Sequence, residues 1–320
     1  DRGVVTNLIT NGVWKTDGAA TVGARRATAA GLCNLGVSID GDEAVHDRIR
    51  GRGTFARAMA SVRAFAAFGM DTTILTTVNR WNLRVLEDIR RLAIDAGASA
   101  WRLQLAKPMG AMDDQRDLIL APKELLALMP LLSRLKKLGG IRIGIGDSLG
   151  YYGEPDRVLR NVGWRGRKET WQGCQAGLLA VGIEADGGVK GCLSMQAHID
   201  GRDPFLEGNL RQHSLEAIWE RRGAFAYNRE FDQDSLTGPC RGCEKGATCR
   251  GGARCVSSAV CGKLTEDPFC YHRVARDAEA ARPAAPTMGA VAVALALTVG
   301  GCGGRSGLST GDPTATDAAP

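Results

Sequence analysis

Cysteine placement is the feature that most constrains this chain. Eight of the ten cysteines in the 320-residue sequence lie between residues 174 and 270. Seven of these follow one spacing, namely Cys174, Cys192, Cys240, Cys243, Cys249, Cys255 and Cys270. A CxxC turn with distant cysteines can bring several thiolates to one centre, as a metal site requires. Ten cysteines are too few for a disulfide scaffold of this length, so the spacing predicts metal binding.

Three interpretations of these cysteines are open from the residues alone. Seven thiolates suit one iron–sulfur cluster with four cysteine ligands and a second with an open iron. CxxC turns serve tetrahedral zinc equally well. Free cysteines can also simply fill core space, although the tight spacing argues against this. Metal-bound thiolates persist best in a reducing compartment, which predicts a cytoplasmic protein.

The first half of the chain predicts an α/β fold. Short β-branched segments alternate with amphipathic stretches, as in repeated β/α units on a parallel sheet. The predicted strands are 4–10, 35–39, 72–78, 101–105 and 141–145, and the predicted helices are 22–30, 55–68, 83–96 and 123–138. Gly31, Gly69, Gly97 and Gly139 stand where these helices should stop. Such units wrap into full or partial barrels with the reactive groups at the carboxyl ends of the strands.

The second half has a different organisation. A Gly- and Pro-rich linker is expected over 144–166, followed by a β-hairpin around Asp186-Gly187-Gly188 with a cysteine at each end and a helix over 214–221. Residues 239–272 show little helical or strand period, so their order should come from ligation.

The tail, residues 283–320, lacks an amphipathic pattern. Its apolar run 288–301 precedes Cys302 and resembles the signal of a lipoprotein. The run is short for a bilayer span. A disordered or mis-joined tail, a weak membrane anchor and a fused peptide all fit it.

The charge distribution of the sequence argues against nucleic acid as a partner. The net charge of +6 comes from a diffuse excess of Arg and Lys, and only 5% of residues are aromatic. Nucleic-acid binding is therefore not expected. A membrane partner is not expected either, because the apolar run of the tail is short for a bilayer span.

The cysteine spacing resembles that of the SPASM domain, the auxiliary-cluster module of radical S-adenosylmethionine (SAM) maturases. The family pattern is Cys, nine to fifteen residues, Gly, four residues, Cys, then CxxCx5Cx3C and a last Cys. Gly187 and the Asp267-Pro268-Phe269-Cys270 ending agree with it. Five residues instead of three precede Cys255, which leaves Cys261 as a spare candidate. The resemblance implies a first auxiliary 4Fe-4S cluster on Cys174, Cys192 and Cys255, and a second on Cys240, Cys243, Cys249 and Cys270.

Residues 35–51, LGVSIDGDEAVHDRIRG, resemble the fourth-strand motif of radical SAM maturases. A Ser at a strand end can donate to a carboxylate or ribose oxygen, and a guanidinium can bind a carboxylate. The resemblance implies SAM contacts for Ser38 and Arg50. Asp40 and His46 are expected to shape the turn and cap the helix. Thr10-Asn11-Gly12 resembles the end of the third strand, which adds Asn11 to the expected cofactor-binding residues.

Two family features are missing from the sequence. The CxxxCxxC loop of the core cluster and the GGEP motif do not occur, which suggests that the amino terminus is truncated and that the chain as written will not cleave SAM. In sulfatase-maturating relatives an Asp follows the second SPASM cysteine as general base, whereas Leu193 follows Cys192 here. A sulfatase is therefore not the expected target, and no catalytic residue is assigned.

The resemblance implies a partial radical SAM barrel lacking its first strands over 1–150, a SPASM domain over 164–275 and a low-complexity tail over 283–320. The implied function is modification of a ribosomally made peptide or protein by radical hydrogen abstraction, with SAM, 4Fe-4S clusters and an electron donor such as flavodoxin or ferredoxin. A non-enzymatic iron–sulfur or zinc protein that binds a peptide or relays electrons is the alternative.

Overall fold

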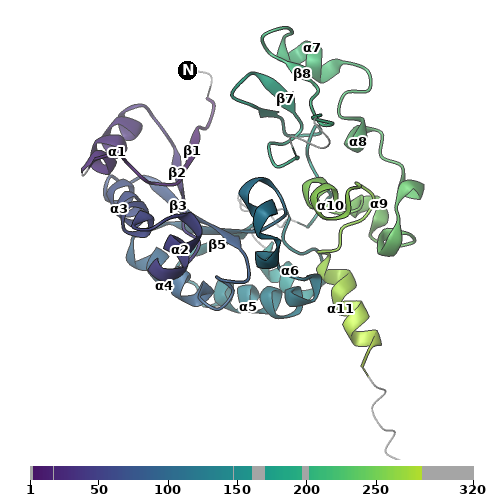
Figure 1. The fold of residues 1–320 in the computed structure, drawn as a ribbon, viewed down its shortest axis with the longest axis horizontal. Helices are drawn as coiled ribbons and strands as arrows, with labels where there is room; N and C mark the ends of the chain where they lie inside the picture. Colours follow the sequence, from purple (N-terminus) through teal and green to yellow (C-terminus); the bar gives the residue numbers. More distant parts are fainter. Residues whose placement is uncertain (1–2, 17, 147, 161–169, 197–201, 283–320) are drawn as a thin grey trace, which may run out of the picture. The chain divides into compact units, whose positions relative to one another are not determined.

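The computed structural model describes residues 3–16, 18–146, 148–160, 170–196 and 202–282 (Figure 1). Residues 1–281 form one compact unit, and residues 282–320 are assigned to a second. The expectations for the tail therefore lie outside the described residues. Within the described part, none of the helices combines the length and apolarity of a membrane span.

The predicted strands form a single parallel sheet in chain order, β1-β2-β3-β4-β5. Their bounds are β1 Asn7–Thr10, β2 Asn34–Ser38, β3 Asp71–Val78, β4 Ala100–Leu105 and β5 Arg142–Ile145. Neighbouring strands in the chain are also neighbours in the sheet, because each connection carries helix back across one face. The prediction of a partial barrel of α/β class is confirmed.

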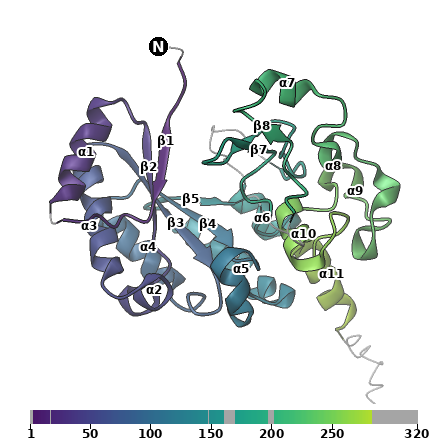
Figure 2. The same cartoon turned by 45° about the horizontal axis from the view of Figure 1, so that its top comes forward.

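The helices of this half lie along one side of the sheet (Figure 2). They are α1 Ala19–Ala29, α2 Glu43–Arg50, α3 Thr54–Ala67, α4 Leu86–Asp95 and α5 Leu125–Lys137, with 3-10 turns η1 Gly110–Leu118 and η2 Pro122–Glu124. The four glycines expected at helix ends all have φ between 68° and 78°. This left-handed conformation stops a helix at little cost only for glycine.

The two faces of the sheet differ in burial. Trp101 and Leu103 on β4 are fully buried in the core beneath the helices, and the Trp101 indole N–H donates to Oγ1 of Thr76 at 2.8 Å. The alternate residues Arg102 and Gln104 are exposed on the opposite face. Because side chains alternate along a strand, one face of the sheet packs the core and the other stays accessible.

Helix α4 begins three residues later than predicted. Asn79 and Asn82 form a turn in which the Oδ1 of Asn82 accepts from the Asn79 backbone N–H at 2.9 Å. The Oδ1 of Asn79 accepts from the backbone N–H of Trp81, also at 2.9 Å. Short amide side chains compete with helical hydrogen bonds in this way, so the apolar periodicity that starts at Leu83 does not mark the helix start.

The second half contains more regular structure than predicted. The expected hairpin is present as antiparallel β6 Gly182–Ile183 and β7 Gly188–Lys190, and the Oδ1 of Asp186 accepts from the Gly188 N–H in its turn. The expected helix is α7 Leu215–Glu220. Unpredicted elements are α6 Gly153–Leu159 inside the expected linker, β8 Gly208–Asn209, α8 Ala226–Arg229, η3 Gln233–Ser235, η4 Gly238–Cys240, α9 Gly246–Cys249, α10 Arg254–Cys261 and α11 Tyr271–Ala280.

The expectation that 239–272 lacks helical structure is therefore wrong. Helix α10 packs Val256 into the main core, where it is fully buried. Apolar packing as well as ligation can order this segment.

Candidate metal centres

Four of the predicted ligands line one cavity of about 390 Å³, called here the four-thiol cavity: Cys240, Cys243, Cys249 and Cys270. Cys240 ends η4, Cys249 ends α9 and Cys270 is the residue before α11. The Cys243 N–H donates to the Cys240 carbonyl at 3.2 Å, which closes the CxxC turn. Three short elements separated along the chain thus present thiols to one space.

The remaining predicted ligands, Cys174, Cys192 and Cys255, line a second cavity of about 460 Å³, the three-thiol cavity. Its wall also includes Thr77 near the end of β3, Gln104 and Lys107 at the end of β4, and Gly146 directly after β5. The cavity therefore joins the carboxyl ends of three parallel strands to three cysteines. In barrels of this kind, the carboxyl ends of the strands form the reaction face.

Lys107 contacts one of these thiols directly. Its Nζ lies 3.0 Å from the Sγ of Cys255, although 148 residues separate the two in the chain. Sequence reasoning missed this residue because nothing in the sequence around Lys107 marks it; the signal lies only in its position just after β4.

A buried carboxylate connects the loops that carry the two sets of cysteines. The Asp267 side chain accepts hydrogen bonds from the Tyr151 hydroxyl at 2.8 Å, the Ala253 N–H at 3.1 Å and the Phe269 N–H at 2.8 Å. Ala253 lies two residues before Cys255, and Phe269 immediately precedes Cys270. Burial raises the pKa of Asp267 to about 6, against the hydrogen bonds that favour its ionised form.

Burial also changes the pKa values of the cysteine thiols. It raises the pKa of Cys249 to about 11 and raises that of Cys270 well above the ordinary thiol value. The pKa of Cys255 is raised by burial as well, with the Lys107 ammonium acting in the opposite direction. Thiolates in such surroundings need a positive partner, which a metal ion supplies. This chemistry and the two convergent sets fit iron–sulfur clusters, and nothing in the donor set distinguishes them from zinc.

Cys33 and Cys261 line neither cavity. Cys261 is the last residue of α10, whereas Cys255 lies one residue from its start. Cys255 thus lines a cavity together with two other predicted ligands and Cys261 does not, and Cys255 as the ligand stays a prediction. Cys302 lies outside the described residues.

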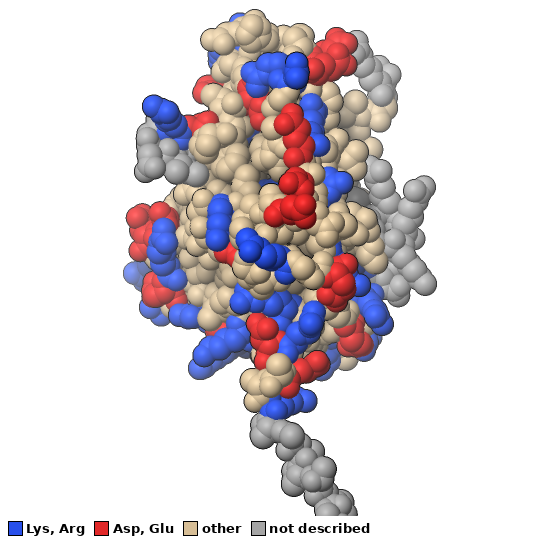
Figure 3. All heavy atoms as spheres, turned by 90° about the vertical axis from the view of Figure 1, so that its right-hand side faces the viewer, with Lys and Arg blue, Asp and Glu red and all other residues tan. Residues whose placement is uncertain are grey.

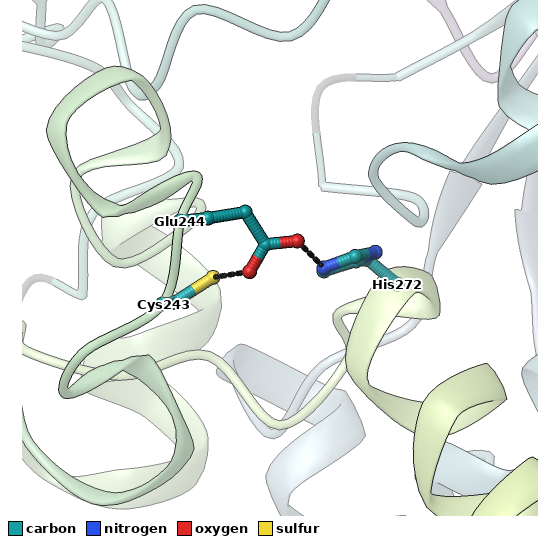
Figure 4. A group of neighbouring side chains, drawn as sticks. All are labelled: Cys243, Glu244 and His272. Carbon is teal, nitrogen blue, oxygen red and sulfur yellow. Dashed lines mark hydrogen bonds and ion pairs between the residues drawn. The ribbon is translucent and has the colours of Figure 1, made fainter.

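One further group of possible ligands consists of Cys243, Glu244 and His272, which lie close together (Figure 4), and Cys243 and His272 of this group line the four-thiol cavity. The Nε2 of His272 lies 2.9 Å from Oε1 of Glu244, and the Cys243 Sγ lies 3.9 Å from Oε2 of the same carboxylate. Arg276 also contacts Glu244. Sequence reasoning did not select His272 or Glu244, although each stands next to or near a predicted ligand in the chain.

The predicted SAM-binding residues lie at the carboxyl ends of β1 and β2. Asn11 follows β1, and its Oδ1 accepts from the Val13 N–H at 3.1 Å. Ser38 ends β2 and pairs in register with Leu75. Leu75 and Thr77 point to the same face of β3, so Ser38 lies on the face of the sheet where Thr77 lines the three-thiol cavity.

Arg50 binds a carboxylate of the protein itself. Its Nε donates to Oδ2 of the buried Asp40 at 2.6 Å, while Oδ1 of Asp40 accepts from the Thr77 N–H at 2.8 Å. The Arg50 guanidinium thus lies at the carboxyl ends of β2 and β3, and its side chain is 30% exposed. None of Asn11, Ser38 and Arg50 lines either thiol cavity.

The helix-capping assignment in this motif needs correction. Asp42 caps α2 by accepting from the Val45 N–H at 2.9 Å, because it is the residue in extended conformation before the first turn. The ring of the buried His46 instead accepts from the Asp40 N–H at 3.2 Å.

Charged side chains of both signs are interspersed over the face in Figure 3. No single basic patch dominates this face, which agrees with the diffuse charge of the sequence.

Residues 174–244 match the SPASM family, an iron–sulfur cluster-binding domain. Among curated relatives, an AdoMet-dependent heme synthase of Methanosarcina barkeri is 27% identical over 285 residues, which cover 85% of this chain and 76% of the relative. A PqqA peptide cyclase of Rhizobium meliloti is 27% identical over 281 residues, covering 86% of this chain and 68% of the relative.

Among solved structures, native anSMEcpe with bound AdoMet and Cp18Cys peptide shares the fold with a TM-score of 0.57 and 18% identity, covering 86% of this chain and 74% of that chain. The domain match, the relatives and the shared fold all agree with the two cysteine sets beside a parallel sheet. Residues 174–244 thus match the SPASM family, and over most of its length the chain is similar to radical SAM enzymes.

Proposed function

We propose that this chain belongs to a maturase whose complete form modifies a ribosomally made peptide or protein by radical hydrogen abstraction. The observation that carries the proposal is the three-thiol cavity, in which the carboxyl ends of β3, β4 and β5 meet Cys174, Cys192 and Cys255. A substrate held there lies between the reaction face of the barrel and a redox centre.

In this proposal, Cys240, Cys243, Cys249 and Cys270 hold one 4Fe-4S cluster. Cys174, Cys192 and Cys255 hold a second, with one iron free for substrate or another ligand. Iron–sulfur clusters supply one-electron transfer, and SAM supplies the hydrogen-abstracting radical in this family. The chain's own residues orient the thiols, bury them and hold the substrate. A flavodoxin or ferredoxin as electron donor and a reducing cytoplasm complete the proposal.

The peptide cyclase relative supports a peptide substrate, and peptide binding tests it. A fluorescently labelled precursor peptide encoded beside the gene should bind the reconstituted chain saturably, as measured by anisotropy, and a scrambled peptide of the same composition should not. Equal binding of both peptides would contradict the proposal.

The heme synthase relative favours a second candidate, a porphyrin substrate. The same titration with an iron porphyrin, followed by the shift of its absorption band, distinguishes the two. Saturable porphyrin binding that the peptide does not displace would replace the peptide proposal.

For the SAM site, Arg50→Met should weaken SAM binding roughly 10- to 100-fold, measured by calorimetry. The substitution removes the guanidinium and with it a proposed charge-assisted hydrogen bond to the SAM carboxylate, worth about 1.5–3 kcal/mol. Arg63→Met is the matched control, since Arg63 is exposed on α3. Equal SAM affinities of the Arg50→Met and wild-type chains would remove Arg50 from the site.

A further inference from the structure

Backbone hydrogen bonds of its neighbours in the chain hold Lys107 at the carboxyl end of β4. The N–H of Ala106, the residue after β4, donates to the Val78 carbonyl at 2.9 Å, and the Met109 N–H donates back to the Lys107 carbonyl at 2.8 Å. The side chain is half-buried and crosses to the second half of the chain, where its Nζ reaches Cys255.

Among the described residues, no carboxylate forms an ion pair with the Lys107 ammonium, and the buried Asp267 interacts with it only at longer range. The fully buried Lys190, by contrast, lies 3.2 Å from Glu184 and 2.6 Å from Asp203. A half-buried cation whose direct partner is a thiol is unusual, because a neutral thiol compensates little of its charge. A thiolate bound to iron carries negative charge and would compensate the ammonium better.

We propose that the Lys107 ammonium donates a hydrogen bond to the iron-bound sulfur of Cys255 and thereby raises the reduction potential of the three-thiol cluster. Reduction adds negative charge to the cluster, and a nearby cation with an N–H···S bond stabilises the reduced form more than the oxidised form. Lys107 acts through Cys255 and is a positioning residue. Because Lys107 follows β4 at the reaction face of the barrel, its side chain connects this face to a ligand of the three-thiol cluster.

This inference rests on the proposed assignment of cluster ligands, and the experiment keeps the two apart. The Cys249→Ala background removes a ligand of the four-thiol cluster, so that the three-thiol cluster is observed alone. In that background the anaerobically reconstituted full chain is titrated with dithionite and followed by electron paramagnetic resonance. If no iron remains in this background, the assignment itself fails, whatever Lys107 does.

With the cluster present, Lys107→Met should shift its midpoint potential to a more negative value, and Lys107→Arg should restore most of the shift. Lys123→Met, which removes an exposed lysine in η2, is the matched control and should leave the potential unchanged. An unchanged potential in Lys107→Met would overturn the inference. So would nitrogen hyperfine coupling showing a Lys107 amine bound directly to iron in the wild-type chain.

If Lys107→Met does not retain the cluster, Lys107→Gln decides the question, since its amide keeps an N–H donor without the charge. A Gln variant that holds iron at a lowered potential supports the inference. Loss of iron in this variant too would make Lys107 a residue for assembly of the cluster and overturn its role in setting the potential.

Discussion

Replacing Cys255 by Ala is expected to lower the iron content of the anaerobically reconstituted chain from about eight to about four atoms, since each cubane cluster holds four irons. Cys255 shares a cavity with Cys174 and Cys192, and none of the three lines the four-thiol cavity. The loss should therefore stop at one cluster. Iron and sulfide analysis with absorption near 400 nm measures it.

Cys261→Ala provides the matched control. Cys261 belongs to the same helix as Cys255 but lines neither cavity, so its removal should leave about eight irons. Iron loss in Cys261→Ala with none in Cys255→Ala would reverse the ligand assignment.

The same preparation separates iron from zinc. Thiolate-bound clusters are coloured and bleach with dithionite, whereas zinc has a filled d shell and does neither. A colourless chain holding about two zinc ions would exclude the auxiliary clusters altogether.

Four of the five strands could be predicted to within one residue at each end, because each is a short apolar or β-branched segment bounded by turn residues, whereas β1 begins three residues later than predicted. The prediction for β4, 101–105, differs from the observed Ala100–Leu105 by one residue. Local periodicity determines such elements, and the glycines after the helices fix where the chain reverses.

Which thiols share a cavity depends on contacts distant in the sequence. The spacing of Cys255 and Cys261 did not distinguish these residues, and only the packing of α10 places the first in the three-thiol cavity. Lys107 and Asp267 also act through partners more than 100 residues away in the chain. The hydrophobic periodicity of the sequence gives no information about contacts between residues so far apart in the chain.

Asp267→Ala is expected to lower the free energy of unfolding by roughly 2–5 kcal/mol, because it leaves the buried Tyr151 hydroxyl and Phe269 N–H without acceptors. Asp267 and Tyr151 are 1% and 0% exposed, so the lost bonds lie in the interior of the protein. Removing the cost of burying the carboxylate offsets part of this loss. Tyr151→Phe is the graded control. It removes the hydroxyl that donates to Asp267 and accepts from the Ala253 N–H at 3.0 Å, but it keeps both backbone bonds to Asp267, so it should cost about 1 kcal/mol.

The effect of Asp267→Ala should also reach both metal sites. Asp267 holds the backbone of Ala253, two residues before Cys255, and of Phe269, directly before Cys270. Iron occupancy should therefore fall at the three-thiol and the four-thiol cavity together, measured in the Cys249→Ala and Cys255→Ala backgrounds that isolate each cluster. If Asp267→Ala empties only one cavity, the carboxylate does not couple the two ligand loops, and each loop is ordered by its own packing.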